Sequence, residues 1–192
     1  MKEKYFKDQD FSRLIFSQGT FEAADYENCI FNACDLSNAD LSMIDFIDCE
    51  FIDCNLSLST LNGTLFQECS FKGCKMLGLK FENCNKFGLS VKFESCVLDH
   101  SSFYETKMKS TVFKGCQLHE VDFTNADLQA SVFGESDLKR AVFRMSNLEQ
   151  ADFRNAINFL IDPELNKVKK SKFTQSSLSG LLSKYQLEID AL

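Results

Sequence analysis

The stretch from residue 41 to residue 81, LSMIDFIDCEFIDCNLSLSTLNGTLFQECSFKGCKMLGLKF, carries a large apolar residue at every fifth position. The series extends without a miss back to Phe6, but the step after Phe81 falls on Lys86. The count resumes two residues out of phase at Phe93 and continues to Phe153. A strict period of five fits neither the 3.6-residue period of an α-helix nor the two-residue alternation of a strand.

A second series lies two residues before the first and holds mostly small residues. All nine cysteines lie on it: Cys29, Cys34, Cys49, Cys54, Cys69, Cys74, Cys84, Cys96 and Cys116. A longer period of twenty is also present, since Phe11, Phe31, Phe51 and Phe71 are identical. Four five-residue units therefore make one turn of a square coil, in which each unit has one large and one small inward position and like residues stack on like.

These residues resemble the pentapeptide-repeat family, whose unit is roughly Ala-(Asp/Asn)-(Leu/Phe)-x-x. Good copies begin at Ala39 (ADLSM), Ala126 (ADLQA) and Ala151 (ADFRN). The resemblance implies an all-β fold, a right-handed quadrilateral parallel β-helix, in which stacked coils are spaced like strands in a sheet, about 4.8 Å apart.

The repeat divides the chain into two parts. Residues 1–158 are expected to form the β-helix, with a kink or small bulge near residues 85–90 where the phase slips, and with the slip separating two halves of the rod. Residues 159–192 are expected to leave the coil at a turn around Pro163, because proline lacks a backbone donor and fixes φ. The spacing of the apolar residues within 174–185 predicts a helix capped by Thr174 or Ser176, followed by a short strand over residues 186–192.

The charges are distributed unevenly. The net charge is −7, yet no Lys or Arg lies between Leu14 and Phe71, a stretch that holds ten acidic residues. All of them lie outside the two inward series and must face solvent or a partner. We predict a partner-binding acidic surface, and its members are Asp25, Asp45, Asp48, Glu50, Asp53 and Glu68. Asp48 and Glu68, twenty residues apart, are expected to stack on adjacent coils, with Glu50 and Asp53 around the same corner. Regularly spaced carboxylates of this kind would attract a basic DNA-binding surface.

Other classes of site are disfavoured by the sequence. The cysteine spacing is not that of zinc sites, so the thiols are predicted to be buried core residues, with no metal and no cofactor. His100 and His119 are expected to face outward, and neither lies in a catalytic motif. A solid rod offers no cleft for a small-molecule substrate, so we predict that the protein is not an enzyme. No apolar run is long enough to cross a membrane and no signal peptide is evident, which predicts a cytoplasmic protein. The acidic surface disfavours nucleic acid as a partner.

The C-terminal part of the sequence resembles particular members of this family. The exit IDPELNKV from Ile161 and the segment GLLSKY from Gly180 resemble the quinolone-resistance (Qnr-type) proteins and the microcin B17 immunity protein. That resemblance implies a DNA-like rod that binds DNA gyrase or topoisomerase IV and protects it from poisons. It also implies a homodimer through the C-terminal segment. The residues predicted for this interface are Leu178, Leu181, Leu182, Tyr185, Leu187 and Ile189. A structural or scaffolding module, in which the acids serve solubility only, is the alternative.

Overall fold

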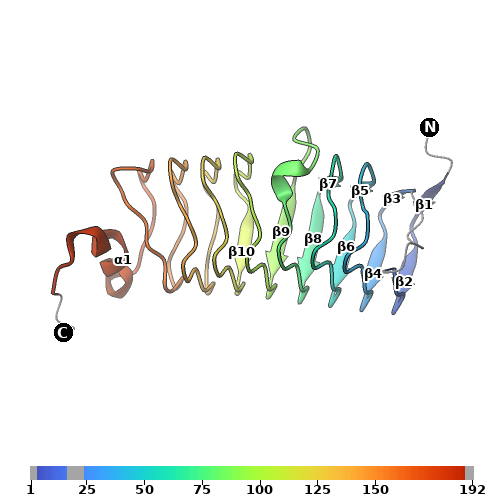
Figure 1. Cartoon of the computed structure of the whole chain (residues 1–192), viewed down its shortest axis with the longest axis horizontal. Coiled ribbons are helices and arrows are strands. Elements are labelled where there is room, and N and C mark those ends of the chain that lie inside the picture. Colours follow the sequence, from blue (N-terminus) through green and yellow to red (C-terminus); the bar gives the residue numbers. More distant parts are fainter. Residues whose placement is uncertain (1–3, 17–23, 189–192) are drawn as a thin grey trace.

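The computed structural model describes residues 4–16 and 24–188. The described chain winds into a rod, with its first strand and its C-terminal helix at opposite ends (Figure 1). Two parallel sheets form adjacent walls of the coil, and neighbouring strands in each sheet come from successive turns, so that Phe31 pairs with Phe51 and Phe51 with Phe71. Wall A contains β1 (Tyr5–Lys7), β3 (Asp25–Glu27), β5 (Asp45–Ile47) and β7 (Leu65–Gln67). Wall B contains β2 (Asp10–Ser12), β4 (Ile30–Asn32), β6 (Glu50–Ile52), β8 (Cys69–Lys72), β9 (Val91–Glu94) and β10 (Val112–Lys114).

The two other walls are held by single parallel bridges. Wall C contains the bridge between Asp35 and Asn55, and wall D contains the bridge between Asp40 and Thr60. The same bridging continues toward the C-terminal end on all four walls, as far as the bridge between Asp152 and Lys172. The predicted right-handed quadrilateral parallel β-helix is confirmed.

Large apolar side chains fill the interior as stacked columns. Phe31 and Phe51 stack with ring centroids 4.8 Å apart, and Phe133 and Phe153 stack at 4.7 Å. Rings in adjacent columns meet edge to face, as Phe46 does with Phe51 at 5.3 Å. Offset stacks and edge-to-face contacts are the two favourable aromatic geometries, each adding about 0.5–1.5 kcal/mol beyond burial. Residues twenty apart therefore stabilise each other directly.

The small inward position supplies a hydrogen-bond donor. The Cys54 thiol donates to the Phe31 carbonyl at 3.2 Å, and the Ser136 hydroxyl donates to the Phe113 carbonyl at 2.9 Å. At many coils this donor reaches the carbonyl of the large residue one coil earlier, and buried polar groups are normally paired in this way. All nine cysteines are buried and free, as predicted. They fill the small position, and several of them, such as Cys54 and Cys74, also donate to a carbonyl of the preceding coil.

The corners of the coil require left-handed backbone. Most are made by residues other than glycine, including Ala33 (φ 51°), Asp48 (φ 52°) and Asp53 (φ 52°). This conformation is disfavoured for residues that carry a Cβ, and Asn and Asp tolerate it better than most. The acidic residues at some corners therefore have a structural reason to be there as well as any functional one.

The phase slip forms a projecting loop. A 3₁₀ turn, η1 (Phe81–Asn83), precedes it, and Gly88 adopts φ 154°. The loop rises above the other coil edges between β8 and β9 (Figure 1), and its Phe87 is 97% exposed. The predicted bulge is confirmed, but the rod is not divided there, because β8 pairs directly with β9 with Phe71 opposite Phe93.

The C-terminal segment is less regular than predicted. The predicted short C-terminal α-helix is confirmed, but it does not extend over all of 174–185: the segment consists of η2 (Gln175–Ser177), α1 (Ser179–Leu182) and η3 (Ser183–Tyr185). A four-residue helix cannot persist alone, so tertiary contacts hold it. Thr174 precedes η2 without a side-chain capping bond to the backbone. Residues 186–188 are not in a strand, and the rest of the predicted strand lies outside the described residues.

This segment folds back on the place where the chain leaves the coil. The Ile161 amide donates to the Gly180 carbonyl at 3.0 Å. Lys184 Nζ lies 2.8 Å from Asp162 Oδ1, and the Tyr185 hydroxyl donates to Glu164 Oε1 at 2.8 Å. The segment therefore caps its own rod.

Candidate acidic binding surface

Two of the predicted acids lie side by side on wall A. Asp25 begins β3 and Asp45 begins β5 on the next coil. Both are half-buried, and the Asp45 amide donates to Asp25 Oδ1 at 3.1 Å. A carboxylate that accepts a backbone N–H contributes to the fold. Asp25 and Asp45 therefore have a local structural role.

Two more of the predicted acidic residues lie at the corner between walls A and B. Asp48 lies between β5 and β6, and Glu68 lies between β7 and β8, one coil later. The Asp48 amide donates to the Gln67 carbonyl, which fixes the stacking of the two corners. Glu68 accepts a hydrogen bond of 2.7 Å from the Ser90 hydroxyl at the end of the projecting loop. The predicted stacking of Asp48 and Glu68 is thus observed.

Glu50 and Asp53 lie further around the coil. Glu50 faces outward from β6 on wall B. Asp53 follows β6 and occupies the far edge of that wall, so it does not share the corner of Asp48 as predicted. Its carboxylate lies over Gly73 of the next coil, where a Cβ would collide with it.

Three of the six carboxylates have no partner in the described part of the chain. No hydrogen bond or ion pair joins Asp48, Glu50 or Asp53 to another side chain within residues 4–16 and 24–188, and all three are exposed. Together they cross wall B from one edge to the other. This arrangement can pair with cations of a partner at no cost to internal contacts.

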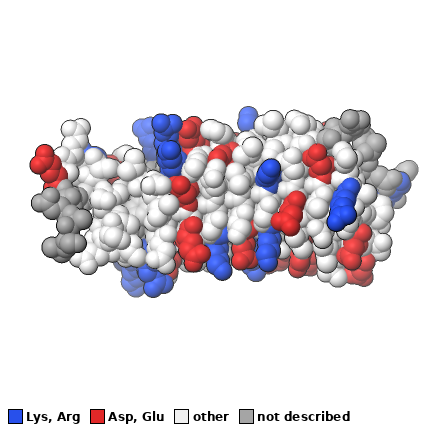
Figure 2. All heavy atoms as spheres, turned by 90° about the horizontal axis from the view of Figure 1, so that it is seen from below, with Lys and Arg blue, Asp and Glu red and all other residues white. Residues whose placement is uncertain are grey.

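The acidic surface ends where the sequence becomes mixed. Beyond Phe71 the outward positions of wall B include Lys72, Lys92 and Lys114, and Lys114 pairs with Glu94 at 3.6 Å. The space-filling view shows acidic and basic side chains intermingled along the rod (Figure 2). The surface therefore covers one part of the rod rather than a whole face.

The residues predicted for dimerisation do not form one helical face. Leu178, Leu182 and Leu187 are 42%, 37% and 57% exposed. Leu181 packs against the core, and the Tyr185 hydroxyl is held by Glu164. Ile189 lies outside the described residues. An exposed leucine patch remains, but Leu181 is part of the cap.

Sequence reasoning missed the environment of the histidines. His100 Nδ1 lies 3.4 Å from Glu120, and His119 lies between Asp99 (3.7 Å) and Asp137 (3.0 Å). His119 is half-buried rather than fully outward, with a 28% exposed side chain. In the sequence, Asp99, His119 and Asp137 are simply residues about twenty positions apart. They become neighbours on wall C only when successive coils stack.

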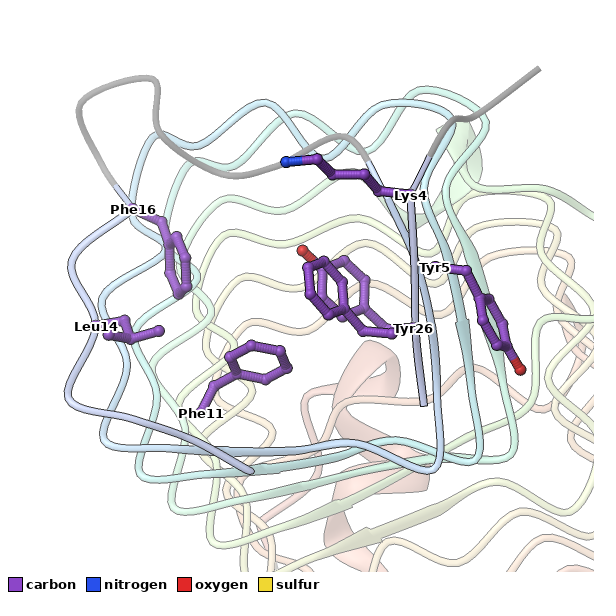
Figure 3. Close-up of a pocket in the computed structure, with 7 residues that line it drawn as sticks. Lys4, Tyr5, Phe11, Leu14, Phe16 and Tyr26 are labelled. Carbon is purple, nitrogen blue, oxygen red and sulfur yellow. The ribbon is translucent and has the colours of Figure 1, made fainter. Parts of the chain in front are cut away.

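No catalytic or metal-binding grouping stands out. Within the described ranges, no cluster of three or more His, Cys, Asp or Glu side chains could hold a metal ion. At the N-terminal end an apolar depression of about 690 Å³ exposes the end of the stacked columns, with Phe11, Phe16 and Tyr26 pointing into the bore and Tyr5 away from it (Figure 3). Within that same part of the chain, no helix is both long and apolar enough to span a membrane.

Family models match most of the rod. Residues 15–51 and 49–85 match a model described as pentapeptide repeats (8 copies), and residues 89–157 match one described as a pentapeptide repeat region. The chain belongs to the pentapeptide-repeat family. The matches stop at residue 85 and resume at residue 89, in the projecting loop, where this chain departs from the count of five.

Solved structures of QnrB1 share the fold. Two trypsin-treated variants of QnrB1, described as a plasmid-mediated fluoroquinolone resistance protein, align with TM-scores of 0.64 and 0.51 at 16% and 18% identity. The alignments cover 98% and 97% of this chain and 99% and 98% of those chains. HetL from Nostoc sp. strain PCC 7120, described as involved in heterocyst differentiation regulation, aligns with a TM-score of 0.33 at 16% identity over 88% of this chain and 84% of that chain. The comparison with curated protein sequences returned no significant match.

Proposed function

We propose that this protein is a non-enzymatic, acidic binding protein that mimics duplex DNA toward a type II topoisomerase. The partner would be DNA gyrase or topoisomerase IV, protected from fluoroquinolone-type or microcin-type poisons. The likeness of the rod to QnrB1 supports this proposal at the level of the fold. A homodimer through Leu178, Leu182, Tyr185 and Leu187, working in the cytoplasm, belongs to the same proposal.

One observation carries it: Asp48, Glu50 and Asp53 are exposed, unpaired within the described chain, and distributed across one wall. Carboxylates that serve the fold accept hydrogen bonds, as those of Asp25 and Asp152 do. These three do not, so their charge is available to a partner. A DNA-binding surface presents Lys and Arg spaced for phosphates, and its attraction to such carboxylates weakens as salt rises.

The test is a gyrase supercoiling assay with and without a fluoroquinolone, together with binding measured at low and high salt. The first variant neutralises the surface by Asp48→Asn, Glu50→Gln, Asp53→Asn and Glu68→Gln. The matched control removes four charges from the other half of the rod by Glu94→Gln, Glu120→Gln, Glu135→Gln and Glu149→Gln. We expect gyrase binding and rescue from the drug to be lost in the first variant and kept in the control.

Binding by neither the wild type nor the control at low salt would refute the topoisomerase proposal. Equal loss in both variants would show that net charge alone matters, without a defined acidic surface. Because surface charges contribute little to stability, both variants should remain folded.

A scaffolding module is the second candidate. Asp48 and Asp53 occupy left-handed corners, a conformation that Asp tolerates well, which favours a purely structural role for them. In that case, the neutralised variant would still capture its cellular partner, and capture would not fade as salt rises.

A further inference from the structure

The register slip removes the regular wall A residue from one coil of the rod. In the coils on either side, that position is filled by Phe66 and Met108, which are fully buried. The residue at the fifth position after Phe81 is Lys86, which is exposed. Leu89 approaches from the returning part of the loop but is only partly buried. The projecting loop, through Leu89, therefore covers this coil in place of a regular wall A residue.

An apolar cavity lies between the projecting loop and residues 105–107 of the next coil. Its volume is about 200 Å³, and its apolar lining comes from Phe81, Cys84, Phe87, Leu89 and the methyl-bearing Thr106. An apolar cavity of about 150 Å³ stays dry and accepts benzene. The cavity at the slip therefore has room for a single aromatic ring.

The thiol in this cavity differs from the others in the chain. Cys54 and its stacked neighbours donate to carbonyls, whereas no hydrogen bond joins the Cys84 thiol to another described residue. Burial, with a smaller contribution from the Glu82 charge, raises the pKa of Cys84 to about 12. The thiol is therefore neutral and presents a polarisable, apolar surface to a ring. Glu82 does not line the cavity.

The rim carries an excess of positive charge. Lys86 and Lys107 line the mouth together with Glu105. The Glu105 carboxylate accepts a hydrogen bond from the Tyr104 hydroxyl, which raises the pKa of Tyr104. No ion pair joins Lys86 or Lys107 to a described residue. Two unpaired ammonium groups thus flank the opening of a ring-sized apolar space.

We propose that this cavity binds a small aromatic carboxylate. The ring would enter between Phe81, Leu89 and Cys84, and the carboxylate would remain at the rim against Lys86 and Lys107. Phe87, exposed at the loop tip, would cover the outer ring face. The break in the five-residue count and the exposed Phe87 each depart from the pattern of the rest of the rod, and such departures concentrate at functional sites. This site is independent of the acidic surface.

The experiment titrates the full-length protein with benzoate and with benzyl alcohol, its neutral counterpart, and follows the methyl resonances of Leu89 and Thr106 by NMR. We expect saturable shifts for benzoate and about tenfold weaker binding of benzyl alcohol, as loss of a charge contact at a partly exposed rim would give. In the variant with Lys86→Gln and Lys107→Gln, the two ligands should bind equally. The control with Lys109→Gln and Lys114→Gln removes two nearby lysines outside the cavity and should keep the difference.

The second part of the experiment fills the cavity with a larger side chain. Cys84→Leu should abolish binding of both ligands, and Leu89→Phe does the same from the rim if the first variant fails to fold. No saturable shift with benzoate would overturn the proposal. So would equal binding of the two ligands by the wild type, or binding that survives both filled variants. Tighter binding after Phe87→Ala would show that Phe87 itself occupies the cavity in solution, which also overturns it.

Discussion

The coils before the projecting loop and the coils after it build the same square cross-section from different residues. Before the loop, the edge-to-face pairs join walls A and B, as in Phe46 with Phe51. After it, they join walls D and B, as in Phe103 with Phe113, while wall A holds Met108 and its aliphatic neighbours. Wall B keeps its aromatic column throughout. The fold therefore needs one continuous ring column on wall B and one partner ring column, which lies on the neighbouring wall A before the loop and on the opposite wall D after it.

The two halves of the rod also differ at the small inward position and on the outer surface. The first half uses cysteines as donors, and the second half mainly uses hydroxyls, such as that of Ser136. Outside, the second half carries internal ion pairs such as Arg140 with Glu120 at 3.1 Å and Lys109 with Asp127 at 3.4 Å. In the first half Lys7 pairs with Glu27, whereas no ion pair joins the exposed carboxylates of Asp48, Glu50 and Asp53 to a described residue. Their exposed charge is thus available for a partner.

The largest expected effect tests the continuity of the wall B column. Phe113→Ala removes a fully buried ring stacked on both sides and should lower the free energy of unfolding by about 3–5 kcal/mol. Phe51→Ala should cost a similar amount, since its column is the same. Urea denaturation measures both. The control is Phe87→Ala, whose free energy of unfolding is expected within about 0.5 kcal/mol of wild type. If either Phe51→Ala or Phe113→Ala cost much less than the other, the wall B column would not be equally important in both halves.

The next effect concerns the small position. Ser136→Ala leaves the Phe113 carbonyl and the Cys116 amide without their 2.9 and 3.0 Å partners and should cost about 1–3 kcal/mol. The thiol of Cys54 is a weaker donor, so Cys54→Ser should be tolerated better than Ser136→Ala. Ser37→Ala serves as the control, because no hydrogen bond of its hydroxyl to a described residue is present. Equal costs for Ser136→Ala and Ser37→Ala would contradict this role for the donor.

A pH effect is expected in the second half. Burial acts to raise the pKa of Asp137, but hydrogen bonds from Asn158 and His119 outweigh it and lower the pKa overall. A carboxyl whose pKa is lower in the folded state contributes stability above its unfolded pKa of about 3.9, and that contribution is lost as pH falls. The wild-type melting temperature should thus fall more steeply below about pH 4 than that of Asp137→Asn. Parallel profiles would show that Asp137 is not involved.

The smallest effect is on the acidic surface. Asp48→Asn should change the free energy of unfolding by less than about 0.5 kcal/mol, because the side chain is exposed and Asn also tolerates the left-handed corner. Asp25→Ala is the comparison, since it removes the oxygen that accepts from the Asp45 amide. Should Asp48→Asn destabilise the rod more than Asp25→Ala, the acid at the corner would be structural.

The sequence alone determined the coil. A period of five within a period of twenty admits one way of stacking, so the large column, the buried cysteines and the position of the slip could all be read from residues 6–153. The acidic stretch was also evident from the sequence, but the corners of the coil that its members occupy were not. Asp53 was assigned to the wrong corner, because the position of each corner depends on which residue takes a positive φ.

Only the tertiary structure decided what happens where the repeat fails. The slip became a loop over a cavity because the coil closes through β8 and β9 and leaves Lys86 outside. The C-terminal segment became a broken helix because contacts such as Ile161 with Gly180 hold each turn separately. His119 acquired Asp99 and Asp137 only when successive coils stacked. Local pattern fixes repeating contacts, whereas a single irregular segment takes its shape from whatever surface the rest of the chain presents to it.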